Sequence, residues 1–75
     1  MADLEVDARG VQCPVPVLRM RRALDQIAIG QTLRVVATDP ATINDFRAFL
    51  LARGDELVEA TQADGEYIYI VRRCV

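Results

Sequence analysis

The sequence predicts an α/β (α+β) two-layer sandwich, in which two helices cover one face of a four-stranded mixed sheet. Three observations lead to this fold class. Short alternations of apolar and polar residues are typical of half-buried strands, and longer stretches with helical spacing are typical of amphipathic helices. Their order is β-α-β-α-β-β, so the first two strands are expected to be parallel and joined by a right-handed crossover. An Asp-Gly turn between the last two strands predicts an antiparallel hairpin.

The first half of the chain is expected to form a strand, a helix and a second strand. Leu4 to Ala8 alternates in polarity and ends at Arg9-Gly10, where Gly10 suits a tight turn. A helix is predicted from about Pro14 to Ala28. Its core face carries Val17, Met20, Leu24, Ile27 and Ala28. The stretch from Thr32 to Thr38 is rich in β-branched residues and is the second strand.

The second half is expected to begin with a helix that starts at Asp39-Pro40. Asp39 is a capping residue, and proline is favoured at the first helical position. Gly54 fits the residue just past the end of this helix. Its core face carries Ile43, Phe46, Phe49 and Leu50. The remaining elements are a strand from Glu56 to Gln62, a turn at Ala63–Glu66 and a strand from Tyr67 to Arg72.

Composition argues against several functional classes. The 75 residues are expected to form one domain, residues 1–75, and no apolar run is long enough to span a membrane. The first residues lack the features of a signal peptide, so we expect a cytoplasmic protein. The net charge of −2 argues against direct nucleic-acid binding through phosphate neutralisation. Histidine and lysine are absent, which removes Cys-His nucleophile pairs and Schiff-base chemistry. We predict no metal site and no cofactor, since two cysteines with carboxylates are an unusual zinc ligand set.

The candidate reactive site is the stretch Gly10-Val11-Gln12-Cys13-Pro14-Val15-Pro16. If Pro14 is the first helical residue, Cys13 is the N-cap, and the N–H of Val15 can point at its sulfur. Because Pro16 biases Val15 away from helical angles, the helix could instead begin at Pro16. In both cases Cys13 lies at a helix start, where its pKa is expected to be lowered. The alternative is a buried structural cysteine, which a turn between prolines and a glycine disfavours.

Asp39 is expected to share a surface with Cys13, because the starts of both helices follow carboxyl ends of strands. We interpret its carboxylate as a cap rather than as a catalytic acid. Its charge is expected to raise the pKa of Cys13, against the helix dipole. Cys74 lies beside the C-terminus and is interpreted as an incidental thiol. The residues expected to support the site by fixing the thiol are Gly10, Pro14, Pro16, Asp39 and Pro40.

The stretch from Val6 to Pro16 resembles the Cys-Pro-X-Pro signature of the TusA/SirA family of small sulfur carriers. Asp39-Pro40-Ala41-Thr42, followed by Asp45-Phe46, is similar to the second motif of that family. The resemblance covers nearly the whole chain. It implies that Cys13 is the sulfur-carrying cysteine and that the two prolines after it are the motif prolines. It also implies a fold like the C-terminal domain of bacterial translation initiation factor three.

The resemblance implies that a cysteine desulfurase or a rhodanese-like sulfurtransferase loads a persulfide onto Cys13. An acceptor protein of the sulfur relay then takes the outer sulfur. Members of the family serve tRNA thiolation, molybdenum cofactor synthesis or the oxidation of reduced sulfur compounds. We therefore expect a monomeric carrier in a sulfurtransferase relay rather than a stand-alone enzyme. Two alternatives stay open: a nucleic-acid-binding module, by fold analogy, and a thiol-redox regulator that uses Cys13 and Cys74.

A docking surface for the partner is predicted on the first helix, next to Cys13. At helical spacing Val15 and Leu18 lie away from the core face, and Arg19 and Arg22 flank them. An apolar centre with charges at its rim is typical of a small interface, and these charges suit an acidic partner. The alternative is a solvated helix face with two exposed apolar residues.

Overall fold

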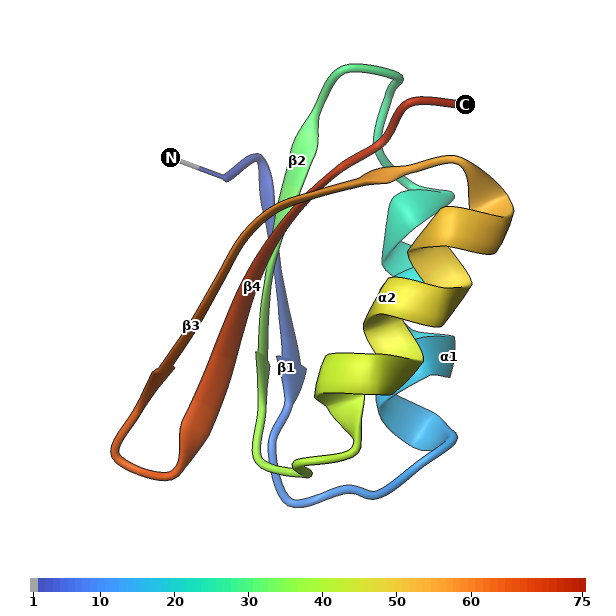
Figure 1. Ribbon diagram of the computed structural model, residues 1–75. Helices are drawn as coiled ribbons and strands as arrows, with labels where there is room; N and C mark the ends of the chain where they lie inside the picture. The colour runs from blue at the N-terminus through green and yellow to red at the C-terminus, as the bar shows by residue number, and fades with distance from the viewer. Residues whose placement is uncertain (1) are drawn as a thin grey trace.

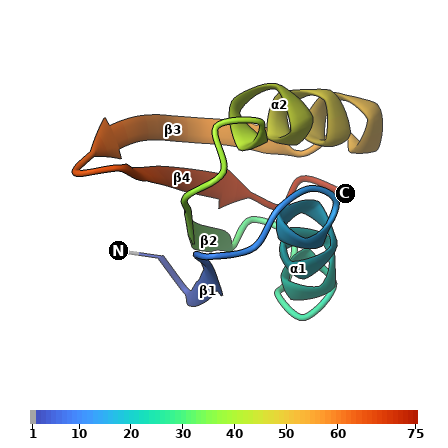
Figure 2. The ribbon, with the colours of Figure 1, turned by 90° about the horizontal axis from the view of Figure 1, so that it is seen from below.

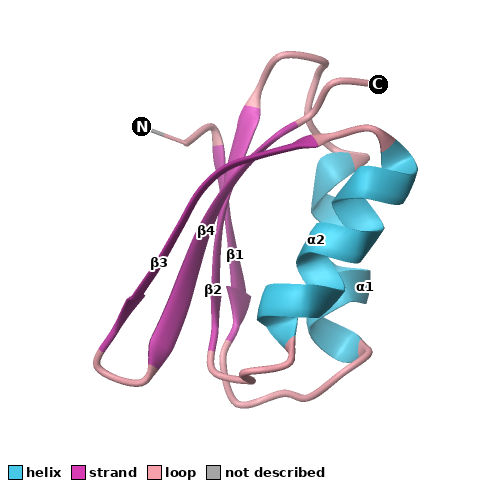
Figure 3. Ribbon diagram, in the orientation of Figure 1, coloured by secondary structure: helices cyan, strands magenta, loops and turns pink. Residues whose placement is uncertain are grey.

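The computed structural model describes residues 2–75 and has four strands and two helices in the predicted order. Both helices lie on one face of the sheet, which confirms the predicted two-layer fold class (Figures 1 and 3). The elements are β1 (Leu4–Ala8), α1 (Val15–Leu24), β2 (Thr32–Ala37), α2 (Thr42–Arg53), β3 (Glu56–Ala63) and β4 (Glu66–Arg72).

The strand order in the sheet is β1-β2-β4-β3, which the sequence did not predict. β1 and β2 are parallel, with Val6 opposite Val35, as expected for a strand-helix-strand unit. β4 is antiparallel to both β2 and β3, and Tyr69 lies opposite Val35 of β2. The last strand of the chain is therefore inserted into the sheet, and β1 and β3 form its two edges (Figure 2).

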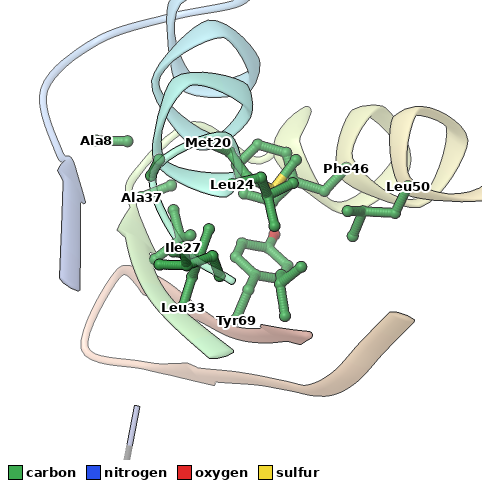
Figure 4. Close-up of a cluster of buried hydrophobic side chains, with 12 residues drawn as sticks. Ala8, Met20, Leu24, Ile27, Leu33, Ala37, Phe46, Leu50 and Tyr69 are labelled. Atoms are coloured by element: carbon green, nitrogen blue, oxygen red, sulfur yellow. The ribbon is translucent and has the colours of Figure 1, made fainter. Parts of the chain in front are cut away.

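The hydrophobic core lies between the helices and the inward-facing residues of the sheet (Figure 4). Every second residue of β2 is fully buried, as the period of a strand requires. The ring of Phe46 from α2 packs edge-on against Tyr69 of β4, with ring centroids 4.7 Å apart. This is a favoured arrangement for aromatic pairs. The other buried side chains of this cluster include Met20, Leu24, Ile27, Leu33, Leu50 and Val71.

α1 is shorter than predicted, since it ends at Leu24 rather than at Ala28, and Ala28 is exposed rather than in the core. The reason lies at the other end of the chain. The guanidinium of Arg73 donates from Nη1 to the carbonyl oxygens of Leu24 and Ile27, at 3.2 and 2.6 Å. These bonds satisfy the carbonyl of the last residue of α1 and a carbonyl three residues beyond it, which a longer helix would bond internally.

The predicted start of the second helix at Pro40 is also wrong, because α2 begins at Thr42 with Ala41 as its N-cap. Asp39, Pro40 and Ala41 form a turn ahead of the helix. The prediction for Gly54 holds: it follows the last helical residue with a φ of 93° and donates its N–H to Leu50.

Candidate functional site

Two loops meet at the carboxyl ends of β1 and β2, at the bottom of Figure 1. One joins β1 to α1 and contains Cys13, and the other joins β2 to α2 and contains Asp39. The N–H of Gly10, which has a φ of 74°, donates to Oγ1 of Thr38 at 2.9 Å. The N–H of Cys13 donates to Oδ2 of Asp39 at 3.1 Å. The predicted proximity of Cys13 and Asp39 is thus present in the structure, and the loops are joined at both points.

Cys13 is exposed and lies one residue before the N-cap of α1, which is Pro14. The expected N-cap position of Cys13 is therefore wrong, and so is the helix start at Pro16. The N–H of Val15 donates to the carbonyl of Gln12 at 2.9 Å, so it is not directed at the sulfur. Pro16 is buried in the first turn, where its missing N–H leaves no helical bond unmade.

The electrostatic surroundings of the thiol differ from the expectation. Hydrogen bonding to the carboxylate of Asp45 raises the pKa of the Cys13 thiol above its ordinary value. Desolvation raises this pKa too, as do the negative charges of Asp45 and Asp39. The expected lowering by the helix start is therefore wrong. The carboxylates that act on the thiol belong to Asp39 of the second loop and Asp45 of the first turn of α2. The N–H of Val15 does not oppose them, because it bonds to Gln12.

Asp45 was part of the second sequence motif but was not predicted as a site residue. It lies in the first turn of α2. The signal that could have identified it is its position: the start of α2 and Cys13 were both expected at the same edge of the sheet. A carboxylate six positions after Asp39, near the start of the same helix, was therefore a candidate neighbour of the thiol.

Asp39 holds the two loops together through three of its oxygen atoms. One carboxylate oxygen accepts from Cys13, and Oδ1 accepts from the N–H of Ala41 at 3.0 Å. Its backbone carbonyl accepts from the N–H of Thr42 at 3.1 Å and from the Thr42 hydroxyl at 2.7 Å. The interpretation of the Asp39 side chain as the cap of the second helix is wrong, because Ala41 is the N-cap of α2 and no side chain among the described residues caps this helix. The carboxylate closes the turn before α2 instead. The same carboxylate also fixes the backbone of the candidate reactive residue.

A buried hydroxyl pair links this loop to the core. Oγ1 of Thr42 and the hydroxyl of Tyr69 are 2.8 Å apart. Thr42 has one hydroxyl proton, which it donates to Asp39, so Tyr69 is the donor in this pair. Burial raises the pKa of Tyr69, which keeps that donor protonated. The chain of bonds runs from Tyr69 through Thr42 and Asp39 to the backbone of Cys13.

The predicted docking residues lie together on the outer side of α1. Val15 is 36% exposed and Leu18 is 52% exposed. With Arg19 and Arg22 they line a groove of ≈ 410 Å³ between α1 and β1. Nη1 of Arg19 also donates to the backbone carbonyl of Asp7 at 2.8 Å. The groove places these side chains as expected, and their role in docking stays a prediction.

Three other features of the described residues concern the predictions. Cys13 and Cys74 are both free thiols, and the N–H of Cys74 donates to Oδ1 of Asp55 at 2.7 Å. Within residues 2–75 we find no group of three or more side chains that could hold a metal ion. Neither helix in this part of the chain has the length and apolar character needed to cross a membrane.

A family model described as "Sulfurtransferase TusA" matches residues 4–73. The chain belongs to the TusA family. It is 39% identical over 71 residues to a protein named sulfur carrier protein TusA from Allochromatium vinosum, covering 95% of this chain and 93% of the relative. A relative of the same name from Pseudomonas aeruginosa is also 39% identical, with 95% and 90% covered.

A solved structure shows the same fold. It is a SirA-like protein from Desulfitobacterium hafniense, with a TM-score of 0.84 and 22% sequence identity, and the match covers 96% of this chain and 99% of that one. The predicted membership of the TusA/SirA family is confirmed by the family model and the relatives. These two relatives are named sulfur carrier proteins, and Cys13 presents an exposed thiol in this chain.

Proposed function

We propose that the chain carries sulfur as a persulfide on Cys13, between a donor enzyme and an acceptor protein. The observation that carries this proposal is the exposed Cys13 thiol, whose backbone is fixed by Asp39 at the junction of two loops. An exposed thiol on a fixed backbone can reach the sulfur atoms of two different partners in turn. Membership of the TusA family supports this use of the thiol. In this proposal residues 1–75 are a single sulfur carrier domain.

Loading is an exchange reaction at sulfur. The thiolate of Cys13 attacks the outer sulfur of a donor persulfide, a new S–S bond forms as the donor S–S bond breaks, and the donor thiolate leaves. In delivery the acceptor attacks that outer sulfur, and the Cys13 thiolate is the leaving group. Asp45 is the group in this chain that interacts with the thiol proton. Because the chain has no histidine or lysine, further acid and base groups come from the partners. The protein is thus a carrier in a sulfurtransferase relay rather than a stand-alone enzyme, and it needs no cofactor of its own.

The partners we propose are a cysteine desulfurase or a rhodanese-like donor and an acceptor of a sulfur relay. The proposed docking residues line one groove, whose lining comes within two positions of Cys13 in the sequence; they are Val15, Leu18, Arg19 and Arg22. The relay serves tRNA thiolation, molybdenum cofactor synthesis or sulfur oxidation. We further propose that the carrier acts as a monomer in the cytoplasm, where thiols stay reduced, and that it does not bind nucleic acid directly.

The test is to incubate the protein with a cysteine desulfurase and cysteine that carries heavy sulfur, and then to locate the added mass in peptides. We expect one added sulfur on the peptide that contains Cys13. Cys13→Ser should abolish loading, and Cys74→Ser, the matched control, should retain it. Sulfur that remains on the Cys13→Ser protein and disappears from Cys74→Ser would contradict the assignment.

The thiol-redox alternative requires Cys13 and Cys74 to form a disulfide, at least for a switch within one chain. A disulfide needs Cα atoms within about 7 Å of each other. The loop that joins β1 to α1 and the C-terminus lie at opposite ends of the molecule in Figure 1. This placement disfavours the alternative and supports separate roles for the two thiols.

A further inference from the structure

The outer edge of β1 presents backbone groups without a strand partner among residues 2–75. Thr32, the first residue of β2, directs its backbone toward β1, since its N–H donates to Oδ2 of Asp3 at 2.9 Å and its carbonyl accepts from the N–H of Asp3 at 3.0 Å. Leu33 therefore faces away from β1, and Leu4, which lies opposite Leu33, directs its backbone groups toward β2. The backbone groups of Glu5 and Asp7 face outward, and the outward carbonyl of Asp7 accepts from Nη1 of Arg19 at 2.8 Å. An edge of this kind can accept an added strand.

A groove runs along this edge, between β1 and α1. It is the ≈ 410 Å³ groove described above, and it is lined on the β1 side as well as on the helix side. Its lining includes the apolar side chains of Leu4, Val6, Val15 and Leu18 and the guanidinium groups of Arg19 and Arg22. A strand added to β1 places every second side chain over this groove.

The charges around the groove select the chemistry of such a strand. All three charged residues of α1 are arginines, at positions 19, 21 and 22. In the described part of the chain, Arg22 forms no ion pair. The carboxylates of β1 are already compensated, since Glu5 pairs with Arg34 at 3.1 Å and Asp7 with Arg9 at 3.0 Å. The helix side of the groove is thus suited to acidic side chains.

The opposite edge of the sheet, β3, does not offer the same site. Its pairing with β4 shifts register between Leu57 and Glu59. A bulge of this kind twists a strand edge and disfavours regular pairing with another chain. β1 has continuous register with β2 over all five of its residues, so its outer edge is regular.

We propose that an extended segment with acidic and apolar side chains, supplied by the protein that exchanges sulfur with Cys13, binds β1 as a fifth strand. The N–H and C=O of Glu5 and the N–H of Asp7 bond the segment, and its side chains fill the groove over Leu18 and beside Arg22. Val15 lines the groove two positions after Cys13, so one end of the segment lies near the loop that carries Cys13. The identity of the occupant rests on the proposed carrier function.

The test uses a tethered peptide, because tethering raises its effective concentration at the groove. The peptide has an N-terminal cysteine activated as a thiopyridyl disulfide, a glycine, and then alternating valine and glutamate over the length of β1. In a Cys74→Ser background, the Cys13 thiolate attacks the peptide sulfur, forms a mixed disulfide and releases the thiopyridone. Amide hydrogen exchange at Glu5 and Asp7 is then followed by NMR. We expect exchange at both amides to slow by about tenfold or more.

Two peptide controls separate strand addition from mere proximity. A peptide methylated on the backbone nitrogens that face β1 keeps its side chains and loses its donors, so it should give no protection. A peptide with lysine in place of glutamate should protect less, by about fivefold in exchange rate. Equal protection by the methylated peptide, or no protection at Glu5 and Asp7 by the glutamate peptide, would overturn the proposal.

Matched variants of the protein locate the binding surface. Arg22→Glu should remove most of the protection, and Arg21→Glu, which makes the same change in charge outside this groove, should retain it. Leu18→Asp should remove it too, and Leu51→Asp, at an α2 residue that is 84% exposed, should not. Equal effects within either pair contradict the assigned groove. Tethering needs only a thiol at position 13, so failure here is distinguishable from failure of Cys13 to accept sulfur from a desulfurase.

Discussion

Removing the acceptor from the buried hydroxyl pair should destabilise the protein more than removing the donor. In Tyr69→Phe, Thr42 still donates to Asp39 and loses only an incoming bond. The expected loss in the free energy of unfolding is about 1 kcal/mol, the net value of a typical hydrogen bond. In Thr42→Val, which is nearly isosteric, the hydroxyl of Tyr69 remains buried without an acceptor. The expected loss is about 2–3 kcal/mol, because an unsatisfied buried donor adds its desolvation cost.

Thermal unfolding followed by circular dichroism measures both losses. For a domain of this size, 1 kcal/mol corresponds to roughly 4–8 °C in Tm. We therefore expect Tm to fall by about 4–8 °C in Tyr69→Phe and by about 8–24 °C in Thr42→Val. The double variant should cost less than the sum of the single variants, because it contains no orphaned hydroxyl. A larger loss in Tyr69→Phe than in Thr42→Val would refute the assignment of Tyr69 as the donor.

Three further predictions concern the thiol, the helix start and the end of α1. Asp45→Asn should lower the pKa of Cys13, since the largest cause of its raised value is removed. Alkylation of Cys13 by iodoacetamide should then begin at lower pH than in the wild type. An unchanged pH profile of alkylation would speak against Asp45 as the cause. Pro14→Ala should change Tm little, because Pro14 is exposed, but should slow sulfur transfer, whereas Pro16→Ala, at a buried residue, should lower Tm. Arg73→Gln should lower the free energy of unfolding by about 1–3 kcal/mol in urea titrations, because the carbonyls of Leu24 and Ile27 lose a charged donor. A stability equal to that of the wild type would argue against a role of Arg73 in ending α1.

The element order was predictable because it depends on local patterns. The alternation in β2 and the helical spacing of Met20 and Leu24 are properties of short windows, and each such window corresponds to one element. The strand order was not predictable in this way. The central position of β4 depends on its pairing with β2. The paired residues are far apart in the sequence, since Val35 and Tyr69 are more than thirty positions apart.

The errors at the helix boundaries have the same origin. The spacing of apolar residues continues to Ile27, and Ile27 is buried, so the pattern alone extends the helix. What ends α1 is a guanidinium from Arg73, 46 positions away from Ile27. Similarly, Asp39 and Pro40 form a helix-start signal, but the Asp39 carboxylate is shared between Ala41 and Cys13, and the helix begins later. Long-range partners decide both ends.

Cys13 was identifiable as the candidate reactive residue from its local sequence, but its electrostatic environment was not. The expected effect of the helix start depended on where the first turn begins and on which N–H groups point at the sulfur. In the structure the N–H of Val15 donates to the carbonyl of Gln12 rather than to the sulfur. The carboxylate that interacts with the thiol belongs to Asp45, on the other helix. The hydrogen bond between Thr42 and Tyr69 was not predicted, for a related reason. The alternation of the last strand accounted for the position of Tyr69, and the partner of its hydroxyl lies on α2.

The raised pKa of Cys13 has a consequence for a carrier that must both accept and release sulfur. Thiolate is the attacking species, so carboxylates that keep the thiol protonated make the free carrier a weak nucleophile. The rate of exchange is highest when the pKa of the attacking thiol lies near ambient pH. Asp45 and Asp39 keep the pKa of Cys13 above its ordinary value. A docked partner that places a cation beside Asp45 reverses this effect, because it neutralises the charge that raises the pKa.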